Sequence, residues 1–178
     1  MSNPSFVHLD VNTQYSLGRS TIRQDQLIDA CTDMGMPAVG VTDHNNLFSA
    51  YKLYKSAQKK GIKYIIGSTV TILDQKERIK SKLSLLCENE TGYKNLCALI
   101  TQSYTEKLDK NEPLIDKKWL ESRTEGLIAI SSSNNGYLQQ SKSMDESTAL
   151  QWINSLQELF PDRLFVSISR MGIPSEEK

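Results

Sequence analysis

Short apolar runs alternate along the chain with longer stretches in which apolar residues recur every three or four positions. The short runs are typical of strands, and the longer stretches are typical of amphipathic helices. Turn-forming and charged residues separate the two kinds of segment. The pattern predicts strands at 6–11, 37–43, 63–67, 69–73, 82–87, 126–133 and 163–169, helices at 21–35, 46–60, 91–107 and 144–160, and a short helix near Trp119.

Capping residues and helical spacing predict where the helices begin, where they end and which sides they bury. Thr21 and Gln24 resemble a capping box, and Gly35 and Gly61 are stop signals. The sides expected to be buried are Leu27, Cys31 and Met34 in the first helix, Tyr93, Leu96, Cys97, Ile100 and Tyr104 in the third, and Ala149, Trp152, Ile153, Leu156 and Phe160 in the last.

Strands that alternate with helices over the whole length predict a parallel α/β architecture, either an open doubly wound sheet or a barrel. The segment after the first strand, "DVNTQYSLGRS", contains neither glycine-rich phosphate motif, which disfavours a nucleotide-binding fold. With 178 residues the chain is long enough for one domain. It stops soon after the last predicted strand, so we expect it to be cut from something longer.

The composition indicates which kinds of partner the chain binds and in which cellular compartment it lies. Lysine plus arginine equals aspartate plus glutamate, 21 against 21, so no net charge attracts nucleic acid or an anionic membrane. The lysine-rich stretch 52–61, "KLYKSAQKKG", is interpreted as a solvated helix face rather than a DNA-binding stripe. No apolar run approaches the about 18 residues of a membrane span, and the N-terminus lacks signal-peptide features. Three cysteines without CxxC spacing favour a reducing cytoplasm and packing roles over catalysis.

Polar residues follow most of the predicted strands, and chemistry in parallel α/β folds collects where strands end. Asp43 and His44 stand out, because a carboxylate beside an imidazole at a strand end is how many metal sites begin. Each has a structural alternative: Asp43 as a cap for the following loop or helix, and His44 as an exposed loop residue. His8, which alternates with Phe6, is expected to pack or to hydrogen-bond. The other strand-end residues are Asp10, Asn12, Ser68, Thr69, Lys82, Ser131, Ser132, Ser133, Asn134, Ser167, Ser169 and Met171.

Six segments together resemble a known family. "FVHLDVNTQYSL", "MGMPAVGVTDHNNL", "YIIGSTV", "CENETGYKNLCALI", "EGLIAISSS" and "FPDRLFVSISRMG" are similar, in order and spacing, to the N-terminal PHP (polymerase and histidinol phosphatase) domain of bacterial DNA polymerase III alpha subunits. The resemblance covers essentially all of residues 1–178. It implies an α/β fold, a distorted (β/α)7 barrel that is truncated C-terminally here, with the palm, fingers and later domains absent.

The resemblance also implies where metal ligands would stand in family members that keep them. The first motif, H-x-H, falls on Asp10 and Asn12, and the second motif is matched by Asp43 and His44. The remaining ligand positions of the family are occupied here by Thr69, Lys82, Ser133, Ser167 and Met171. A final Asp and His pair of the family would lie beyond Lys178.

These replacements predict a degenerate site. Hydroxyl groups are poor neutral ligands, and an ammonium repels a cation at short range. Asp43 and His44 remain as a weak remnant, and we expect no catalytic residue and no metal in this chain. Lys82 is expected either to form an ion pair with Asp43 or Asp10, in place of the lost cations, or to extend into solvent.

The resemblance implies a non-catalytic scaffold that packs against the rest of the polymerase alpha subunit and docks its proofreading exonuclease subunit. The longer protein would be a DNA-directed DNA polymerase, a nucleotidyltransferase that uses magnesium in its palm. Contact with DNA would come only through that longer protein, and no membrane partner is expected. The alternatives are an active metal-dependent phosphoesterase or 3′–5′ exonuclease and, less favoured, a stand-alone PHP protein.

Overall fold

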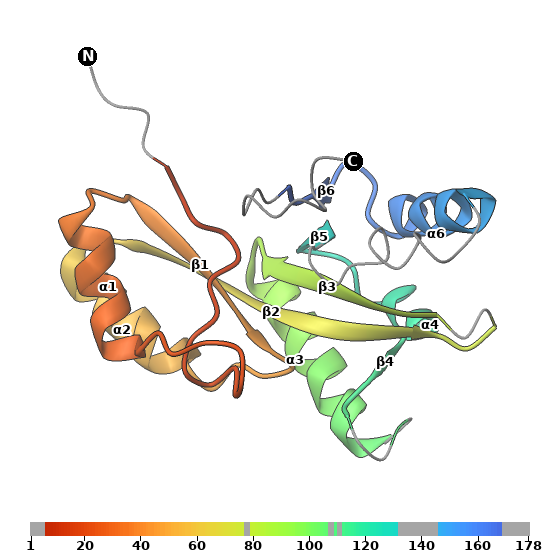
Figure 1. Ribbon diagram of the computed structural model, residues 1–178, viewed down its shortest axis with the longest axis horizontal. Helices are drawn as coiled ribbons and strands as arrows, with labels where there is room; N and C mark the ends of the chain where they lie inside the picture. The colour runs from red at the N-terminus through yellow and green to blue at the C-terminus, as the bar shows by residue number, and fades with distance from the viewer. Residues whose placement is uncertain (1–5, 77–78, 107–108, 110–111, 132–145, 169–178) are drawn as a thin grey trace, which may run out of the picture.

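A six-stranded sheet forms the centre of the computed structural model, with helices packed on it (Figure 1). The structure describes residues 6–76, 79–106, 109, 112–131 and 146–168. Five strands follow the order β1-β2-β3-β5-β6, and β4 pairs with β2 beyond this path. The elements are α1 (Gln24–Asp33), β1 (Ala38–His44), α2 (Ala50–Lys60), β2 (Lys63–Asp74), β3 (Ile79–Cys87), α3 (Glu90–Thr105), β4 (Ile115–Asp116), α4 (Lys117–Leu120), β5 (Leu127–Ser131), α6 (Glu146–Leu159) and β6 (Leu164–Val166).

The predicted α/β class is confirmed, but the sheet is mixed rather than parallel. β2 pairs antiparallel with β3, and β3 pairs antiparallel with β5, whereas β1–β2, β2–β4 and β5–β6 are parallel. The reason is the short connection after β2: only the four residues 75–78 separate it from β3, and a turn of that length can join antiparallel strands only. The two strands predicted at 63–67 and 69–73 form one continuous strand, β2.

The first predicted strand, 6–11, is not a regular strand in the structure. It forms one isolated parallel bridge, Val11 to Val41, and three backbone hydrogen bonds with β1. The segment lies so close to β1 that a Cβ atom added at Gly40 would stand 2.9 Å from the Leu9 Cα atom. Gly40 therefore allows this segment to pass across the sheet, which places Asp10 and Asn12 beside the end of β1.

The predicted helices are present, with changes at their ends and faces. α1 begins after Arg23 without a side-chain cap, so the capping box predicted from Thr21 and Gln24 is wrong, whereas Gly61 ends α2 in the left-handed conformation as expected. Met34 lies past the end of α1 and is exposed. α3 buries Leu96 and Leu99 in the core and leaves Tyr93 and Tyr104, which were expected to be buried, exposed. The buried side of this helix therefore differs from the side that the spacing predicted.

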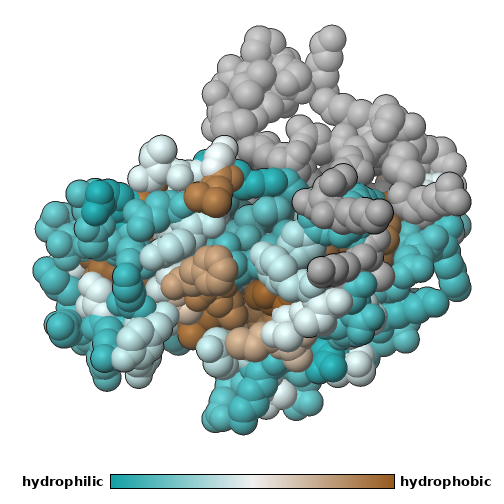
Figure 2. Space-filling model, turned by 90° about the horizontal axis from the view of Figure 1, so that it is seen from below, coloured by the Kyte–Doolittle hydropathy of each residue, from teal (hydrophilic) through white to brown (hydrophobic). Residues whose placement is uncertain are grey.

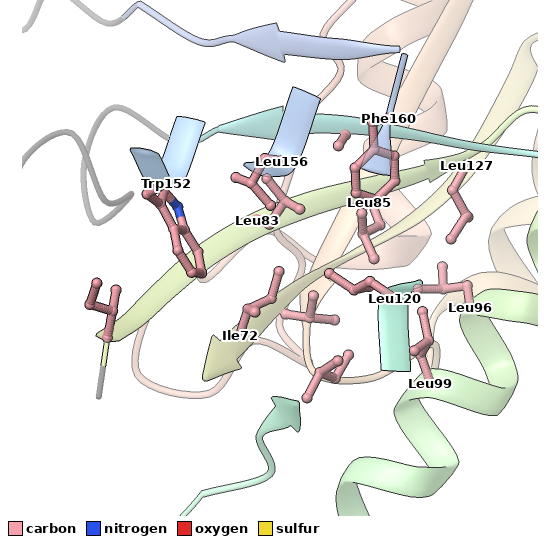
Figure 3. Packing of buried hydrophobic residues seen from close by; sticks show 14 of the residues in the cluster. Ile72, Leu83, Leu85, Leu96, Leu99, Leu120, Leu127, Trp152, Leu156 and Phe160 are labelled. Carbon is pink, nitrogen blue, oxygen red and sulfur yellow. The ribbon is translucent and has the colours of Figure 1, made fainter. Parts of the chain in front are cut away.

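The main hydrophobic core lies between one face of the sheet and the helices α3, α4 and α6 (Figure 3). Leu83 and Leu85 of β3 and Ile72 of β2 pack there against Leu96 and Leu99 of α3. The last helix and the residue after it contribute four of the five predicted residues, Ala149, Trp152, Leu156 and Phe160, whereas the predicted Ile153 is half-buried. A second cluster joins α1 and α2 to Val39 and Val41 of β1, with the predicted Leu27 and Cys31 in it. The alternate strand residues lie on the opposite face, where most of the candidate site lies.

Candidate functional site

The strand register brings three of the predicted site positions to one face of the sheet. His44 is paired with Thr69, and Thr69 is paired with Ser84. Two residues along, Lys82 is paired with Thr71. Directly paired residues point to the same side of a sheet, and so do residues two apart on a strand. His44, Thr69 and Lys82 therefore share the face opposite the helices α3 and α6, which we call the polar face.

Asp43 lies on the other face, because neighbouring residues of a strand point in opposite directions. Its side chain is buried, 1% exposed, and both carboxylate oxygens accept hydrogen bonds. Oδ1 accepts from the Thr13 backbone N–H and the Ser16 hydroxyl, each at 2.7 Å. Oδ2 accepts from the Thr13 and Ser49 hydroxyls, also at 2.7 Å. The carboxylate thus joins the loop of residues 13–16 to Ser49, the residue before α2.

This arrangement is close to the structural alternative for Asp43. Ser49 is the residue before α2 and makes no side-chain cap to the helix backbone. It donates instead to Asp43, so the aspartate anchors the start of the helix through a hydroxyl rather than by capping its amide groups. Thr13, Ser16 and Ser49 were not singled out by the sequence analysis, because only the folded chain brings their hydroxyl groups around one carboxylate.

Asp10 and Asn12 lie beside Thr42 of β1. One oxygen of Asp10 accepts hydrogen bonds from the Thr42 hydroxyl and, at 2.9 Å, from the Ser84 hydroxyl. The Asn12 side chain donates to the Thr42 carbonyl oxygen at 2.9 Å. Ser84 also bonds to the Thr69 hydroxyl at 2.8 Å, so hydroxyl groups link Asp10 to the predicted position Thr69. Asp10 itself is exposed.

His44 is half-buried at the end of β1 rather than exposed in a loop. Its backbone N–H donates to the Ser16 hydroxyl at 3.1 Å, and its Nε2 atom lies 3.3 Å from the Asn45 side-chain nitrogen. Its Nδ1 atom is buried and has no hydrogen-bond partner among the residues that the structure describes. Burial, together with repulsion by Arg19 and Lys82, lowers the pKa of His44 to about 4. The imidazole is therefore neutral near pH 7.

The predicted ion pair of Lys82 with Asp43 or Asp10 is wrong. Among the residues that the structure describes, Lys82 has no ion pair. Asp43 points to the opposite face, and Asp10 is bound by hydroxyl groups instead. Burial and the nearby Arg19 lower the pKa of Lys82, and Glu112 partly opposes this effect. Arg19 and Lys82 thus make the surroundings of His44 positive, a feature that the sequence alone did not reveal.

The remaining predicted site positions either lie at one cavity or fall outside the residues that the structure describes. Ser167 donates its backbone N–H to the Ser131 carbonyl at 3.0 Å and lines a cavity of about 650 Å³ together with Asp10. The other walls are largely apolar, with Ile65, Leu86, Ile130 and Phe165 among them. Ser132, Ser133, Asn134, Ser169 and Met171 lie outside the described residues.

His8 and Cys31 are the residues for which a packing role was expected instead of a catalytic one. His8 is exposed and packs edge-to-face on Phe6, with ring centroids 4.8 Å apart. Cys31 is buried, and burial raises the pKa of its thiol. Both observations agree with packing roles for these residues.

The donor set of the polar face does not fit a metal cluster. Within the described ranges, no group of three or more histidine, cysteine, aspartate or glutamate side chains converges as metal ligands would. Asp10 and His44 lie on this face, Glu112 is near enough to His44 to oppose the lowering of its pKa, and the side chains of Asp43 and His44 diverge. A metal cluster that hydrolyses phosphate esters needs several nitrogen and oxygen donors, including carboxylates that bridge the ions.

Comparison with known proteins shows a family match and relatives that cover nearly the whole chain. The PHP domain family profile matches residues 8–171. The DNA polymerase III subunit alpha of Pseudomonas aeruginosa is 36% identical over 176 residues, which cover 98% of this chain and 15% of that protein. The DNA polymerase III subunit alpha of Escherichia coli is 35% identical over 179 residues, 99% of this chain and 15% of that protein. The chain therefore spans about 15% of the length of these curated relatives.

A solved structure supports the fold independently of sequence identity. An amidohydrolase from Chromobacterium violaceum, determined with bound sulfate and without metal, superposes with a TM-score of 0.51 at 11% identity and covers 96% of this chain and 88% of that one. At this identity the likeness concerns the fold alone. No helix among the residues placed by the structure has the length and apolar character needed to cross a membrane.

Proposed function

The chain belongs to the PHP domain family, and on this premise we propose that it is a non-catalytic, structural PHP domain of a DNA polymerase III alpha subunit. The longer protein would carry the DNA-directed DNA polymerase activity, a nucleotidyltransfer with magnesium in its palm, and would act in the cytoplasm. The family match and the relatives named DNA polymerase III subunit alpha support this assignment. The geometry of Asp43 supports the loss of catalysis.

The observation that carries the proposal is that Asp43 serves a structural network. Its four hydrogen bonds at 2.7 Å satisfy both oxygens on the face away from His44 and Lys82. A hydrogen bond to a charged group contributes about 1.5–3 kcal/mol to stability. Turning this carboxylate towards a metal on the polar face would break all four bonds and reverse the direction of a strand residue. We infer that Asp43 is retained because it holds the loop of residues 13–16 against α2.

The charges on the polar face support the same conclusion. Arg19 and Lys82 are close enough to His44 to lower its pKa, and Arg19 lowers the pKa of Lys82 as well. Each positive charge raises the free energy of a divalent cation placed nearby. A metal on this face would therefore be repelled by two side chains, and only Asp10 and His44, with the nearby Glu112, would attract it.

Metal binding measured together with hydrolysis tests the proposal. We expect the chain, dialysed against zinc or manganese, to retain no stoichiometric metal by elemental analysis and to release no phosphate from a phosphate ester and no nucleotide from a DNA 3′ end. Replacing ligand positions by Asp10→His, Asn12→His, Thr69→Glu and Lys82→His together is expected to increase metal uptake. Lys76→His, at an exposed position away from the site, is the control. Stoichiometric metal with turnover in the unmodified chain would establish the alternative, an active phosphoesterase or exonuclease.

The second part of the proposal concerns partners, namely the rest of the alpha subunit and its proofreading exonuclease subunit. An apolar groove of about 450 Å³ lies between the loop after β1 and α3, lined by Leu47, Phe48, Cys97, Ile100 and Tyr104. Figure 2 shows hydrophobic residues gathered near the middle of the face seen from below. Phe48 is 69% exposed and Tyr104 50% exposed, and exposed apolar groups that cluster in this way mark contact surfaces. We assign this groove to contact with another part of the polymerase chain.

Co-purification tests the partners one at a time. The chain is mixed with the remainder of the alpha subunit, or with the exonuclease subunit, and the complexes are separated by size. We expect both complexes to form, and Phe48→Ser with Tyr104→Ser to weaken only the first. Loss of neither complex in that variant would remove the groove from the proposal, and failure of the unmodified chain to bind either partner would refute the scaffold role.

A further inference from the structure

The outer surface of α2 concentrates positive charge in a chain whose net charge is zero. The helix, Ala50–Lys60, contains Lys52, Lys55, Lys59 and Lys60 and no acidic residue. Lys60 is paired with Asp29 of α1 at 3.3 Å. Lys52, Lys55 and Lys59 form no ion pair with any residue that the structure describes. Three uncompensated positive charges therefore remain on one helix.

These lysines are arranged as a stripe. They are spaced at i, i+3 and i+7, the spacing that places side chains on one side of a helix. The opposite side of α2 is buried in the core through Leu53 and Ala57, which are 0% and 1% exposed. Seven residues of helix extend about 10 Å, a length comparable to a few phosphates of a nucleic-acid strand. The lysines thus present their charges outward along a line.

Two tyrosines lie beside the lysine stripe, both on the same side of it. Tyr51 is 67% exposed and Tyr54 is 52% exposed, although large aromatic side chains usually bury most of their area. The Lys55 ammonium lies 4.7 Å from the centroid of the Tyr51 ring, which holds one charge beside one aromatic surface. Proteins bind single-stranded nucleic acids with exposed aromatic rings and nearby lysines. The bases stack on the rings, and the phosphates pair with the ammonium groups.

We propose that the outer surface of α2, formed by Tyr51, Lys52, Tyr54, Lys55 and Lys59, is a binding site for single-stranded nucleic acid. Phosphates of the strand lie along the three lysines, and unpaired bases stack on the two tyrosines. The inference is independent of the metal site, since none of these residues lies on the polar face of the sheet. It revises the interpretation of this stretch as an ordinary solvated helix face.

Other classes of partner fit this surface less well. An amphipathic helix binds a membrane through its apolar side, and that side of α2 is already buried against α1 and β1 through Leu53 and Ala57. Protein interfaces are depleted in lysine relative to the rest of the surface, whereas this surface has three lysines in a row. Nucleic acid is the partner that uses both the charges and the aromatic rings.

Fluorescence anisotropy with a labelled oligothymidylate tests the site on the chain itself. We expect weak binding, with a dissociation constant on the order of 10⁻⁴ to 10⁻⁶ M near physiological salt. The logarithm of the affinity should fall with the logarithm of the salt concentration with a slope of about −2, since three phosphate contacts each contribute about 0.7 on a single strand. A slope near zero would contradict the proposal.

Matched variants separate charge from stacking. Lys52→Glu with Lys55→Glu and Lys59→Glu is expected to lower the affinity at least about tenfold, while the three corresponding Arg variants retain binding. Tyr51→Ser with Tyr54→Ser is expected to lower the affinity at least about fivefold while leaving the salt slope unchanged, because a stacked base contributes about 1–3 kcal/mol. The control carries the same charge change at exposed lysines elsewhere, as Lys76→Glu, Lys94→Glu and Lys118→Glu.

The variants change exposed side chains, so thermal melting curves should show that each remains folded. Binding that the control weakens as much as the α2 variants would show attraction without a site and would overturn the proposal. Equal competition by polyglutamate or by phosphatidylserine vesicles would also overturn it, since neither offers bases to stack. Weaker binding in the lysine-to-glutamate variant and in the tyrosine variant of α2, with unchanged binding in the control and in the arginine variants, would establish the surface.

Discussion

The two faces of the sheet are built from the same strands, but their chemistry differs around Lys82 and Ser84 of β3. One face carries Leu83 and Leu85, which pack against α3 and α6 in the main core. The other carries Lys82 and Ser84, the residues adjacent to them in sequence. The first face is stabilised by burial of apolar area. The second is stabilised near Asp10 by hydrogen bonds among hydroxyl groups, whereas Leu86 and Ile130 on the same face line the largely apolar cavity.

This contrast shows why neighbours in sequence need not share a site. Asp43 and His44 look like one motif, and the strand that carries them separates their side chains to opposite faces. Asp43 becomes part of the structural network with Thr13, Ser16 and Ser49, and His44 lies near Lys82 and Arg19. Substitutions of adjacent residues should therefore have unequal effects.

The largest expected difference is between Leu85 and its neighbour Ser84. Leu85→Ala should lower the free energy of unfolding by about 3–4 kcal/mol, because it opens a cavity in a core where Leu85 is 0% exposed. Ser84→Ala should lower it by only about 1 kcal/mol, since it removes one hydroxyl that bonds to Asp10 and Thr69. Urea unfolding followed by circular dichroism measures both. Equal losses would show that the two faces are not energetically distinct.

The next difference is between the two aspartates of the site. Asp43→Ala should lower the free energy of unfolding by about 2–3 kcal/mol, because three hydroxyl groups and one backbone N–H lose their acceptor in a buried place. Asp10→Ala, at an exposed carboxylate, should cost less than about 1 kcal/mol. The same unfolding measurement compares them, with metal-free buffer excluding any ligand effect. A larger loss for Asp10 would reverse our assignment of the structural carboxylate.

The smallest expected effect concerns the titration of His44. Lys82→Met should raise the pKa of His44 from about 4, because one repulsive charge is removed, but should leave it below 6.5, since burial is the largest cause. NMR titration of the imidazole protons measures the shift. Lys76→Met, a charge removed at an exposed position elsewhere, is the control and should leave the pKa unchanged.

The same group makes stability depend on pH with a defined sign. The unfolded chain binds a proton at His44 near pH 6.5, and the folded chain does so only near pH 4. Its contribution to stability is therefore fully present above pH 6.5 and is lost as the pH falls towards 4. His44→Ala should flatten the unfolding free energy over this interval. An unchanged pH dependence in that variant would show that His44 is not the titrating group.

Much of the fold could be predicted from local patterns. Helical spacing placed Trp152, Leu156 and Phe160 in the core, and Gly61 ended α2 as expected. The errors arose where tertiary contacts override local signals. Tyr93 and Tyr104 share an apolar side of α3 by spacing, but the helix turns Leu99 to the sheet instead. The short connection between β2 and β3 made the sheet mixed, although the alternation of strands and helices indicated a parallel one.

The candidate site could be predicted only as a set of positions. The resemblance pointed to Asp10, Asp43, His44, Thr69 and Lys82 as candidate positions, and the strand register places His44, Thr69 and Lys82 on one face. The resemblance did not reveal that Arg19 approaches His44, or that Thr13 and Ser16 bind Asp43. Thr13 and Ser16 lie 30 and 27 positions from Asp43 in the sequence, and Arg19 is similarly far from His44. Contacts at that separation leave no periodic signal in the sequence.

The sequence by itself determined the family and the α/β class, because these depend on residue identity and on periodicity along the chain. Only the tertiary structure decided which carboxylate is buried, which lysine is unpaired and which face of α2 is exposed. The physical reason is that hydrogen bonding, burial and charge repulsion depend on distances between segments, and those distances exist only once the strands have paired and the helices have packed.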